Sequence, residues 1–264
     1  MKKLFLTLAL AVTAMTAFAA KETIKIAPFT GGENVTADEL ASLRAAVVEA
    51  FSSLGRFSIM DSNTDGATAN YEIKGNVVSV AYVYTEHKND DGSISKTYEA
   101  TVNMSLSAIN LSNGETISTQ SFDSNKNFGE IFLKGWGEET AYTQATALKN
   151  ASKFMAKYRF PKWIEETFKA QGKILEMDEV KNDNEVKSFL ISLGTDDGIK
   201  KGQKFDVQLR STVAGRIRMK VIGEAQCESV EGADISLCKV KKGGKEIYKA
   251  FTETPDDLFI QTKK

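Results

Sequence analysis

The residues best suited to chemistry in this chain lie in one loop between two predicted strands. From Asp61 to Glu72 the sequence matches the twelve-position calcium loop, with Gly66 at the position of the sharp bend. The side-chain ligands would be Asp61, Asn63, Asp65 and Glu72, which supply the hard oxygens that calcium prefers. Both flanks resemble strands rather than helices, so a solvated turn rich in Asn, Asp and Gly is the alternative.

A second candidate site is an apolar stretch, interrupted by glycines, that precedes a predicted helix. Its large side chains include Phe128, Ile131, Phe132 and Trp136. Aromatic anchors carry much of the energy of protein interfaces, so these residues are predicted to bind a partner protein. The alternative is that the stretch folds back over the sheet as a lid, because large apolar side chains are usually buried.

The only two cysteines, Cys227 and Cys238, flank a predicted hairpin centred on Gly232 and Ala233. A two-residue loop there would place the cysteines directly opposite each other, within the distance that a disulfide tolerates. An oxidising compartment would favour that bond. A disulfide between Cys227 and Cys238 is therefore predicted, and two buried free thiols are the alternative.

Catalytic arrangements are poorly supported. His87 is the only histidine and lies in the charged segment 86–91, yet a Ser-His-Asp site would have to use it. A zinc site would need His87 together with the two cysteines and carboxylates, which is a poor set of ligands. No catalytic residue is assigned, and the chain is expected not to be an enzyme.

One strand carries alternating positive charges at Arg216, Arg218 and Lys220. These side chains share a strand face and could bind an anionic surface or polymer, although a solvated face is the simpler interpretation. The chain as a whole has 34 basic and 35 acidic residues, a balance that favours no nucleic-acid partner.

The first 19 residues have the pattern of a secretory signal peptide. Lys2 and Lys3 precede an apolar run, and residues 17–19 form a small-x-small cleavage site without a lipobox cysteine. No later stretch reaches the roughly 18 consecutive apolar residues of a membrane helix. The protein is therefore expected to be exported by a cleaved signal peptide, not to span a membrane, and to work in the periplasm or outside the cell.

Two domains are predicted after the signal peptide. Residues 20–175 show the order strand, helix, four strands and helix, with a capping box at Thr36 to Glu39 and a tight Asn113-Gly114 turn. This order predicts an α+β domain, with helices packed on an antiparallel sheet. Residues 176–186 are acidic and non-periodic, typical of a linker. Residues 187–264 read as short strands without a helical period, which predicts a small β-barrel.

Several of these strand and turn patterns resemble known periplasmic modules. They are segments 24–29, 71–77, 106–111 and 113–115, and the alanine-rich helix after Ala141. On these patterns, residues 23–173 are similar to the α/β module shared by the curli secretion subunit CsgG, the lipoprotein activators of penicillin-binding proteins, the amino-terminal domain of TolB and the middle domain of the flagellar ring protein FlgT. Segments 193–207 and 221–224 resemble the carboxy-terminal β domain of FlgT-like proteins.

The resemblance implies a non-enzymatic protein that docks onto other envelope proteins or assembles into rings. Envelope proteins are therefore the expected partners, and a homo-oligomer is an expected state. No cofactor is expected other than calcium in the first loop. The competing hypothesis is a periplasmic protein that binds calcium or another ligand through residues 61–72, and a weaker third hypothesis is a hydrolase with unrecognised carboxylates.

Overall fold

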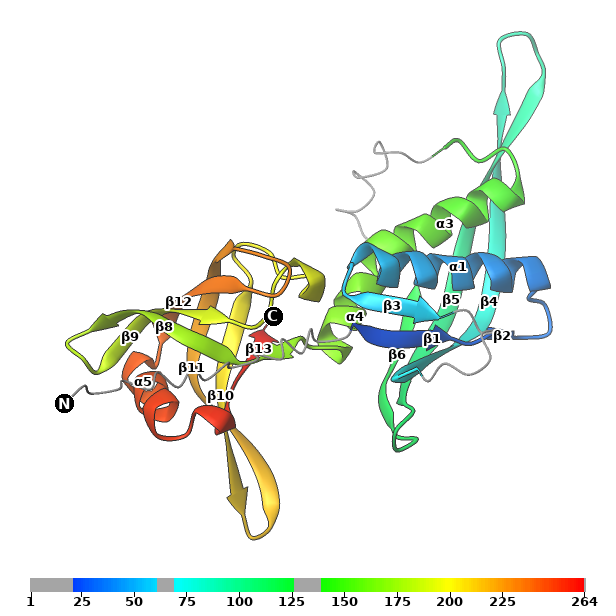
Figure 1. Cartoon of the computed structure of the whole chain (residues 1–264). Coiled ribbons are helices and arrows are strands. Elements are labelled where there is room, and N and C mark those ends of the chain that lie inside the picture. Colours follow the sequence, from blue (N-terminus) through cyan, green and yellow to red (C-terminus); the bar gives the residue numbers. More distant parts are fainter. Residues whose placement is uncertain (1–20, 61–68, 126–138, 264) are drawn as a thin grey trace, which may run out of the picture.

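The computed structural model describes residues 21–60, 69–125 and 139–263. Two sheets, each with its own hydrophobic core, divide these residues into an N-terminal body that ends near Phe168 and a C-terminal body that begins near Ala170 (Figure 1). Because the first core ends at Phe168, the change between bodies falls several residues before the predicted domain end at 175. The class is α+β, as predicted.

The N-terminal body contains a six-stranded mixed sheet in the order β3-β1-β4-β5-β6, with β2 beside β4. Its strands are β1 (Glu22–Ile26), β2 (Thr30–Gly31), β3 (Phe57–Met60), β4 (Tyr71–Lys88), β5 (Ile94–Asn110) and β6 (Thr116–Asp123). The prediction of an antiparallel sheet is wrong at β1, which is parallel to both β3 and β4, and at β2, which is parallel to β4. The helix between β1 and β3 supplies the long crossover that parallel neighbours require.

Three helices cover one face of this sheet (Figure 1). They are α1 (Ala37–Ser53), α3 (Gln144–Tyr158) and α4 (Phe160–Thr167). The capping box of α1 is confirmed: Glu39 N–H donates to Thr36 Oγ1 at 3.3 Å, and Thr36 N–H donates to Glu39 Oε2 at 2.8 Å. The apolar face of α1 buries Leu43, Val47 and Phe51 as its periodicity predicts.

Trp163 on α4 lies at the centre of the first core and is 2% exposed. Its ring makes edge-to-face contacts with Phe51, Phe122 and Phe168, and its indole N–H donates to Ser118 Oγ at 2.9 Å. These contacts fix α4 to the sheet. The opposite side of α4 faces the C-terminal body.

The C-terminal body is a seven-stranded antiparallel sheet in the order β7-β13-β10-β11-β12-β9-β8, curled into a half-barrel. Its strands are β7 (Gln171–Gly172), β8 (Ile174–Lys181), β9 (Glu185–Ile191), β10 (Lys204–Val213), β11 (Arg216–Val230), β12 (Ser236–Lys242) and β13 (Leu258–Lys263). The edge strands β7 and β8 are separated in the chain by Lys173 alone. A short 3₁₀ turn, η2 (Thr195–Asp197), lies between β9 and β10, and a second, η3 (Pro255–Asp257), precedes β13.

Two features of this body correct the sequence interpretation. Residues 176–186 form most of the β8–β9 hairpin rather than a linker, with Asn182 and Asp183 at positive φ in its turn. Their polarity fits an edge strand, whose outer side chains face water. Helix α5 (Gly244–Glu253) was not predicted, because only Ile247 and Ala250 of its ten residues are buried and the apolar period is therefore too short to recognise.

Within the described ranges, none of the helices has the length and apolar character needed to cross a membrane.

Candidate functional site

The predicted calcium loop lies mostly outside the described residues, which exclude Asp61, Asn63 and Asp65. Its last ligand, Glu72, is in β4, where its carboxylate lies 3.3 Å from Lys25 Nζ and 3.5 Å from Lys74 Nζ. This single carboxylate is therefore already paired with two ammonium groups. Elsewhere in the part of the chain that the structure describes, no three His, Cys, Asp or Glu side chains are grouped to hold a metal. Calcium binding stays a prediction.

The predicted partner-binding residues Phe128, Ile131, Phe132 and Trp136 also lie outside the described residues. The last described residue before them is Asn125, which follows β6, and the first after them is Glu139, which precedes α3. Their role as a protein-binding patch stays a prediction.

Cys227 and Cys238 are directly opposite each other on β11 and β12, so the predicted register is confirmed at this pair. The predicted two-residue loop is wrong, because the N–H groups of Glu231 and Gly232 both donate to Ile235 O. A register shift between Cys227 and Ser229 restores the alignment. Both side chains are buried free thiols in the structure, and burial raises the pKa of each. The disulfide stays a prediction.

Two hairpins project from the bodies, one from each sheet (Figure 1). The aromatic arm, residues 82–99, is the distal part of the β4–β5 hairpin. The basic arm, residues 210–221, is the distal part of the β10–β11 hairpin, and every one of its side chains is exposed. The sequence predicts these strands but not how far they extend beyond the packed layers, because strand length alone does not reveal where packing stops.

The aromatic arm presents ring-bearing side chains on one face. Tyr84 and Tyr98 are cross-strand neighbours with ring centroids 6.1 Å apart, and Lys96 Nζ lies 4.5 Å from the Tyr84 ring centroid. At the base, the Tyr82 hydroxyl donates to Glu39 Oε1 at 2.6 Å. Burial, together with this bond, raises the pKa of Tyr82. The arm is therefore anchored to the start of α1 while Tyr84, 54% exposed, and Ile94, 65% exposed, stay open to a partner.

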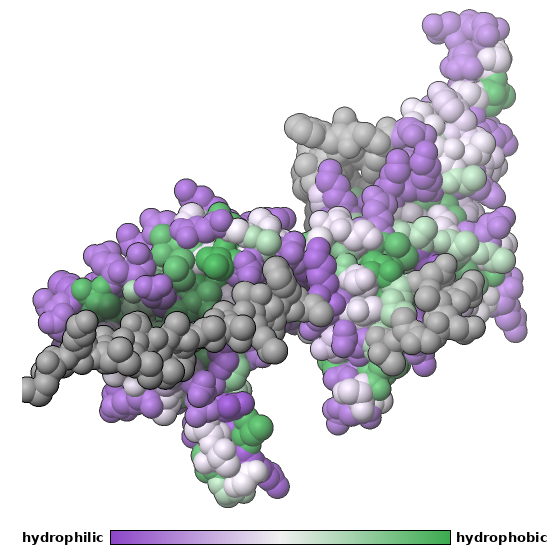
Figure 2. Space-filling model, in the orientation of Figure 1, coloured by the Kyte–Doolittle hydropathy of each residue, from purple (hydrophilic) through white to green (hydrophobic). Residues whose placement is uncertain are grey.

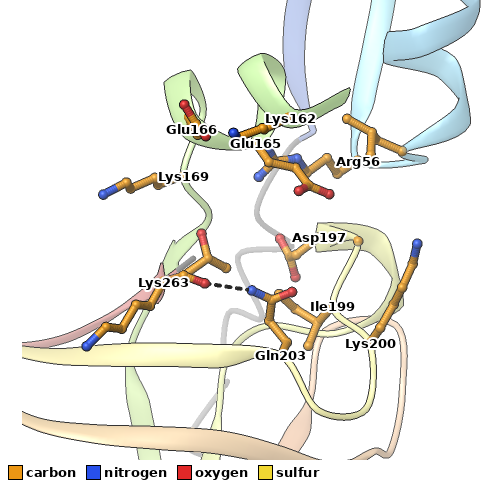
Figure 3. A pocket seen from close by; sticks show the side chains of 13 residues that line it. Arg56, Lys162, Glu165, Glu166, Lys169, Asp197, Ile199, Lys200, Gln203 and Lys263 are labelled. Atoms are coloured by element: carbon orange, nitrogen blue, oxygen red, sulfur yellow. Dashed lines mark hydrogen bonds between the residues drawn. The ribbon is translucent and has the colours of Figure 1, made fainter. Parts of the chain in front are cut away.

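A cleft of about 300 Å³ lies between the two bodies (Figure 3). The wall from the N-terminal body comes from the α1–β3 turn and from α4, on the side opposite Trp163. The wall from the C-terminal body comes from η2, the loop after it and the end of β13. The lining residues include Arg56, Lys162, Glu165, Asp197, Ile199 and Gln203. The Gln203 amide donates to Lys263 O at 3.2 Å.

Arg56 is the central charge of this cleft. Its guanidinium packs over the Phe57 ring, 4.6 Å from the centroid, and its Nη2 is buried without a hydrogen-bond partner. Burial lowers the pKa of Arg56, while Glu22, Glu165 and Asp197 act in the opposite direction. Since Arg56 is surrounded by carboxylates from both bodies, the cleft carries mixed charge and selects neither an anionic nor a cationic ligand.

Close contacts beside Arg56 hold the bodies together. Gly198, with φ of 73°, lies so near the α1–β3 turn that a Cβ there would be 3.1 Å from Leu54 O. Lys21 Nζ lies 3.7 Å from Asp196 Oδ1 and donates to Gly55 O at 3.0 Å. The turns 54–56 and 195–198 therefore form the contact through which one body positions the other.

Asp197 gives this contact a pH dependence. Burial raises the pKa of Asp197, although its carboxylate accepts the Gly194 N–H at 2.8 Å. The native state therefore keeps this proton to a higher pH than the unfolded chain. Between the unfolded pKa, about 3.9 for an aspartate, and the higher native value, the free energy of unfolding falls as pH rises.

We expect Asp197→Asn to remove this fall, because asparagine keeps an acceptor for Gly194 but does not ionise. The free energy of unfolding of the variant, relative to the original chain, should rise between about pH 4 and pH 7. Urea unfolding at several pH values measures it. Asp90→Asn removes the same charge from an exposed side chain in the turn of the β4–β5 hairpin, outside this contact, and is the matched control. Parallel pH profiles for Asp197→Asn and the original chain would contradict the assignment.

The sequence matches no protein-family model, and no curated protein is significantly similar to it. Among solved structures, the chain is similar to the PelC dodecamer from Paraburkholderia phytofirmans, with 15% identity, a TM-score of 0.32, and coverage of 53% of this chain and 87% of the other. It is also similar to lipoprotein GNA1162 from Neisseria meningitidis, with 12% identity, a TM-score of 0.27, and coverage of 42% of this chain and 90% of the other. A third similar structure is TolB from Acinetobacter baumannii, with 11% identity, a TM-score of 0.22, and coverage of 83% of this chain and 60% of the other. Identities and TM-scores this low establish neither a shared fold nor a shared function.

Proposed function

We propose that this chain is an exported envelope protein that binds other envelope proteins, as an assembly or accessory factor without catalytic activity. The aromatic arm is the observation that carries the proposal. A hairpin that projects beyond its sheet and leaves a tyrosine and an isoleucine exposed gives up burial that both side chains would otherwise gain. Contact with a partner protein would recover that burial.

The composition of the arm fits a protein partner. Tyrosine is enriched among residues that dominate interface energies, because it combines a large apolar ring with a polar tip and few rotatable bonds. The arm also mixes both charges, with Lys96 Nζ 3.2 Å from Glu86 Oε1, so it has no strong preference for one sign of charge. An aromatic centre with a balanced polar rim is typical of a protein interface.

The test is affinity capture from cross-linked cell envelopes, comparing the tagged protein with a Tyr84→Ser/Ile94→Ser variant. A tyrosine hot spot is worth 2 kcal/mol or more, so affinity for an identified partner should fall roughly 30-fold or more. Leu111→Ser/Ile117→Ser, which changes two exposed apolar residues outside the arm, is the matched control. A partner retained equally by all three proteins would remove the aromatic arm from the proposal.

The patch predicted from the sequence is tested in the same assay with Phe132→Ala/Trp136→Ala. Loss of the partner only in this variant would place the contact there instead of on the aromatic arm. The specific resemblance to CsgG-like and FlgT-like modules, a small C-terminal β-barrel and a homo-oligomeric state remain part of the proposal.

The cleft supports one alternative, a periplasmic ligand-binding protein, because clefts between domains are common ligand sites and its volume is at the lower end of their range. Calcium bound through residues 61–72 belongs to the same alternative. Either ligand would raise the melting temperature if it binds only the folded state. A calcium-dependent rise that a chelator reverses would distinguish this alternative from protein docking.

A further inference from the structure

The basic arm is a second exposed surface, chemically different from the aromatic arm. Its twelve residues contain no carboxylate, and its large apolar side chains lie in the open. Ile217 is 72% exposed and Val221 51% exposed, and Val213 and Met219 are also exposed. In Figure 2 the lower projecting arm shows hydrophobic and hydrophilic surface side by side. Neither core covers these side chains.

The hairpin register separates the side chains of the basic arm into two faces. Directly opposed residues of an antiparallel pair share a face, and alternate residues share it along each strand. One face therefore carries Ile217, Met219 and Val221 of β11. Their cross-strand partners on the same face are Thr212, Arg210 and Gln208 of β10. The other face carries Arg216, Arg218 and Lys220 of β11. Their cross-strand partners on that face are Val213, Ser211 and Leu209 of β10. The face of Ile217, Met219 and Val221 is largely aliphatic, because its one cation, Arg210, is paired with Asp257. The other face carries Arg216, Arg218 and Lys220 beside Val213, so the arm is an amphipathic ribbon.

The charges of the arm fit an anionic partner. Arg210 is paired at the base, where its Nε lies 2.9 Å from Asp257 Oδ1. The other three cations of the arm make no ion pair with any residue that the structure describes. The arm carries four positive charges, which leaves −5 on the rest of a chain whose formal net charge is −1. An anionic surface would attract the arm and repel the rest, so the protein would approach it arm first.

The aliphatic face decides which anionic partner fits. A soluble polyanion offers charge but no apolar environment for Ile217, Met219 and Val221. A lipid bilayer offers phosphate groups and, directly beneath them, acyl chains. The arm also has no aromatic residue of the kind that anchors protein interfaces.

The open edges of the arm limit how deep it enters. Strand β10 pairs with β13 only as far as Leu209, and β11 pairs with β12 only from Glu224. The outer N–H and C=O groups of residues 210–221 would lose water in the hydrocarbon core without gaining partners, at a high cost. We propose that the basic arm binds the surface of an anionic lipid bilayer at the depth of the headgroups, in addition to the protein binding proposed above.

The experiment is co-sedimentation of the protein, purified after export and signal cleavage, with vesicles of phosphatidylcholine alone or with about a third phosphatidylglycerol. Binding is expected only to the anionic vesicles. Arg216→Gln/Arg218→Gln/Lys220→Gln should weaken it roughly 100-fold, because each of the three basic residues contributes about fivefold near such a surface. Ile217→Ser/Met219→Ser/Val221→Ser should weaken it about 10-fold or more, because the aliphatic contact is lost.

Lys153→Gln/Lys245→Gln/Lys249→Gln makes the same change in net charge on exposed helical positions and should leave vesicle binding unchanged. All variants should keep the original melting temperature, since every altered side chain is exposed. Absence of binding to anionic vesicles would overturn the proposal. Binding that survives the serine variant and is competed fully by soluble polyglutamate would also overturn it, and would assign the arm to an acidic polymer or protein instead.

Discussion

The oxidised, exported protein is expected to unfold with a free energy about 3 kcal/mol higher than the same protein after reduction. The reason is a disulfide between Cys227 and Cys238, which closes a loop spanning residues 227–238 and restricts the unfolded chain. A chain-entropy estimate for a loop of that length gives this magnitude.

The ladder geometry supports this disulfide. Cys227 N–H donates to Gln203 O at 2.8 Å, and Cys227 O accepts from Gly202 N–H at 2.9 Å, so both groups point away from β12. Cys227 and Cys238 are therefore a non-hydrogen-bonded pair, whose Cα atoms are about 4.5 Å apart in antiparallel sheets. That separation lies within the range of disulfides.

Urea unfolding with and without reductant measures the effect. Cys227→Ser/Cys238→Ser should unfold identically in both conditions and near the reduced original. Burial raises the pKa of both thiols, so the reduced pair should also react slowly with alkylating reagents until the body unfolds. Two titratable thiols in unfolded, unreduced protein from the periplasm would show that the bond does not form.

Trp163→Ala is expected to lower the free energy of unfolding by about 4 kcal/mol, because replacing a buried Trp leaves a large cavity. The ring is enclosed by Phe51, Phe122 and Phe168, which α1, β6 and the end of α4 bring together. The loss should also loosen α4, whose Lys162 and Glu165 form one wall of the cleft.

Two matched variants separate packing from hydrogen bonding at this position. Trp163→Phe keeps an aromatic ring but removes the donor to Ser118, and Ser118→Ala removes only the acceptor. Losing one such hydrogen bond costs about 1 kcal/mol, so Ser118→Ala should be much milder than Trp163→Ala. Denaturant unfolding followed by circular dichroism gives the values. Similar losses for Ser118→Ala and Trp163→Ala would contradict the packing explanation.

Much of the local structure followed from neighbouring residues. The capping box at Thr36 and Glu39 and the Gly114 turn with its φ of 73° agree with their sequence signals. Each of these depends on hydrogen bonds or dihedral preferences within a few residues. The opposition of Cys227 and Cys238 was also predictable, although the loop and the register shift that produce it were not.

Contacts between distant residues were decided only by the tertiary structure. The parallel position of β1, the cleft in which Arg56 meets Asp197, and the extension of both arms beyond their sheets have no signature in short segments. They depend on which apolar faces cover one another, and therefore on the packing free energy of the whole chain. Residues 210–221 are the clearest case. Their alternation of basic and aliphatic residues predicts a strand, but only the tertiary structure, in which neither core reaches these residues, leaves both faces of the hairpin in solvent.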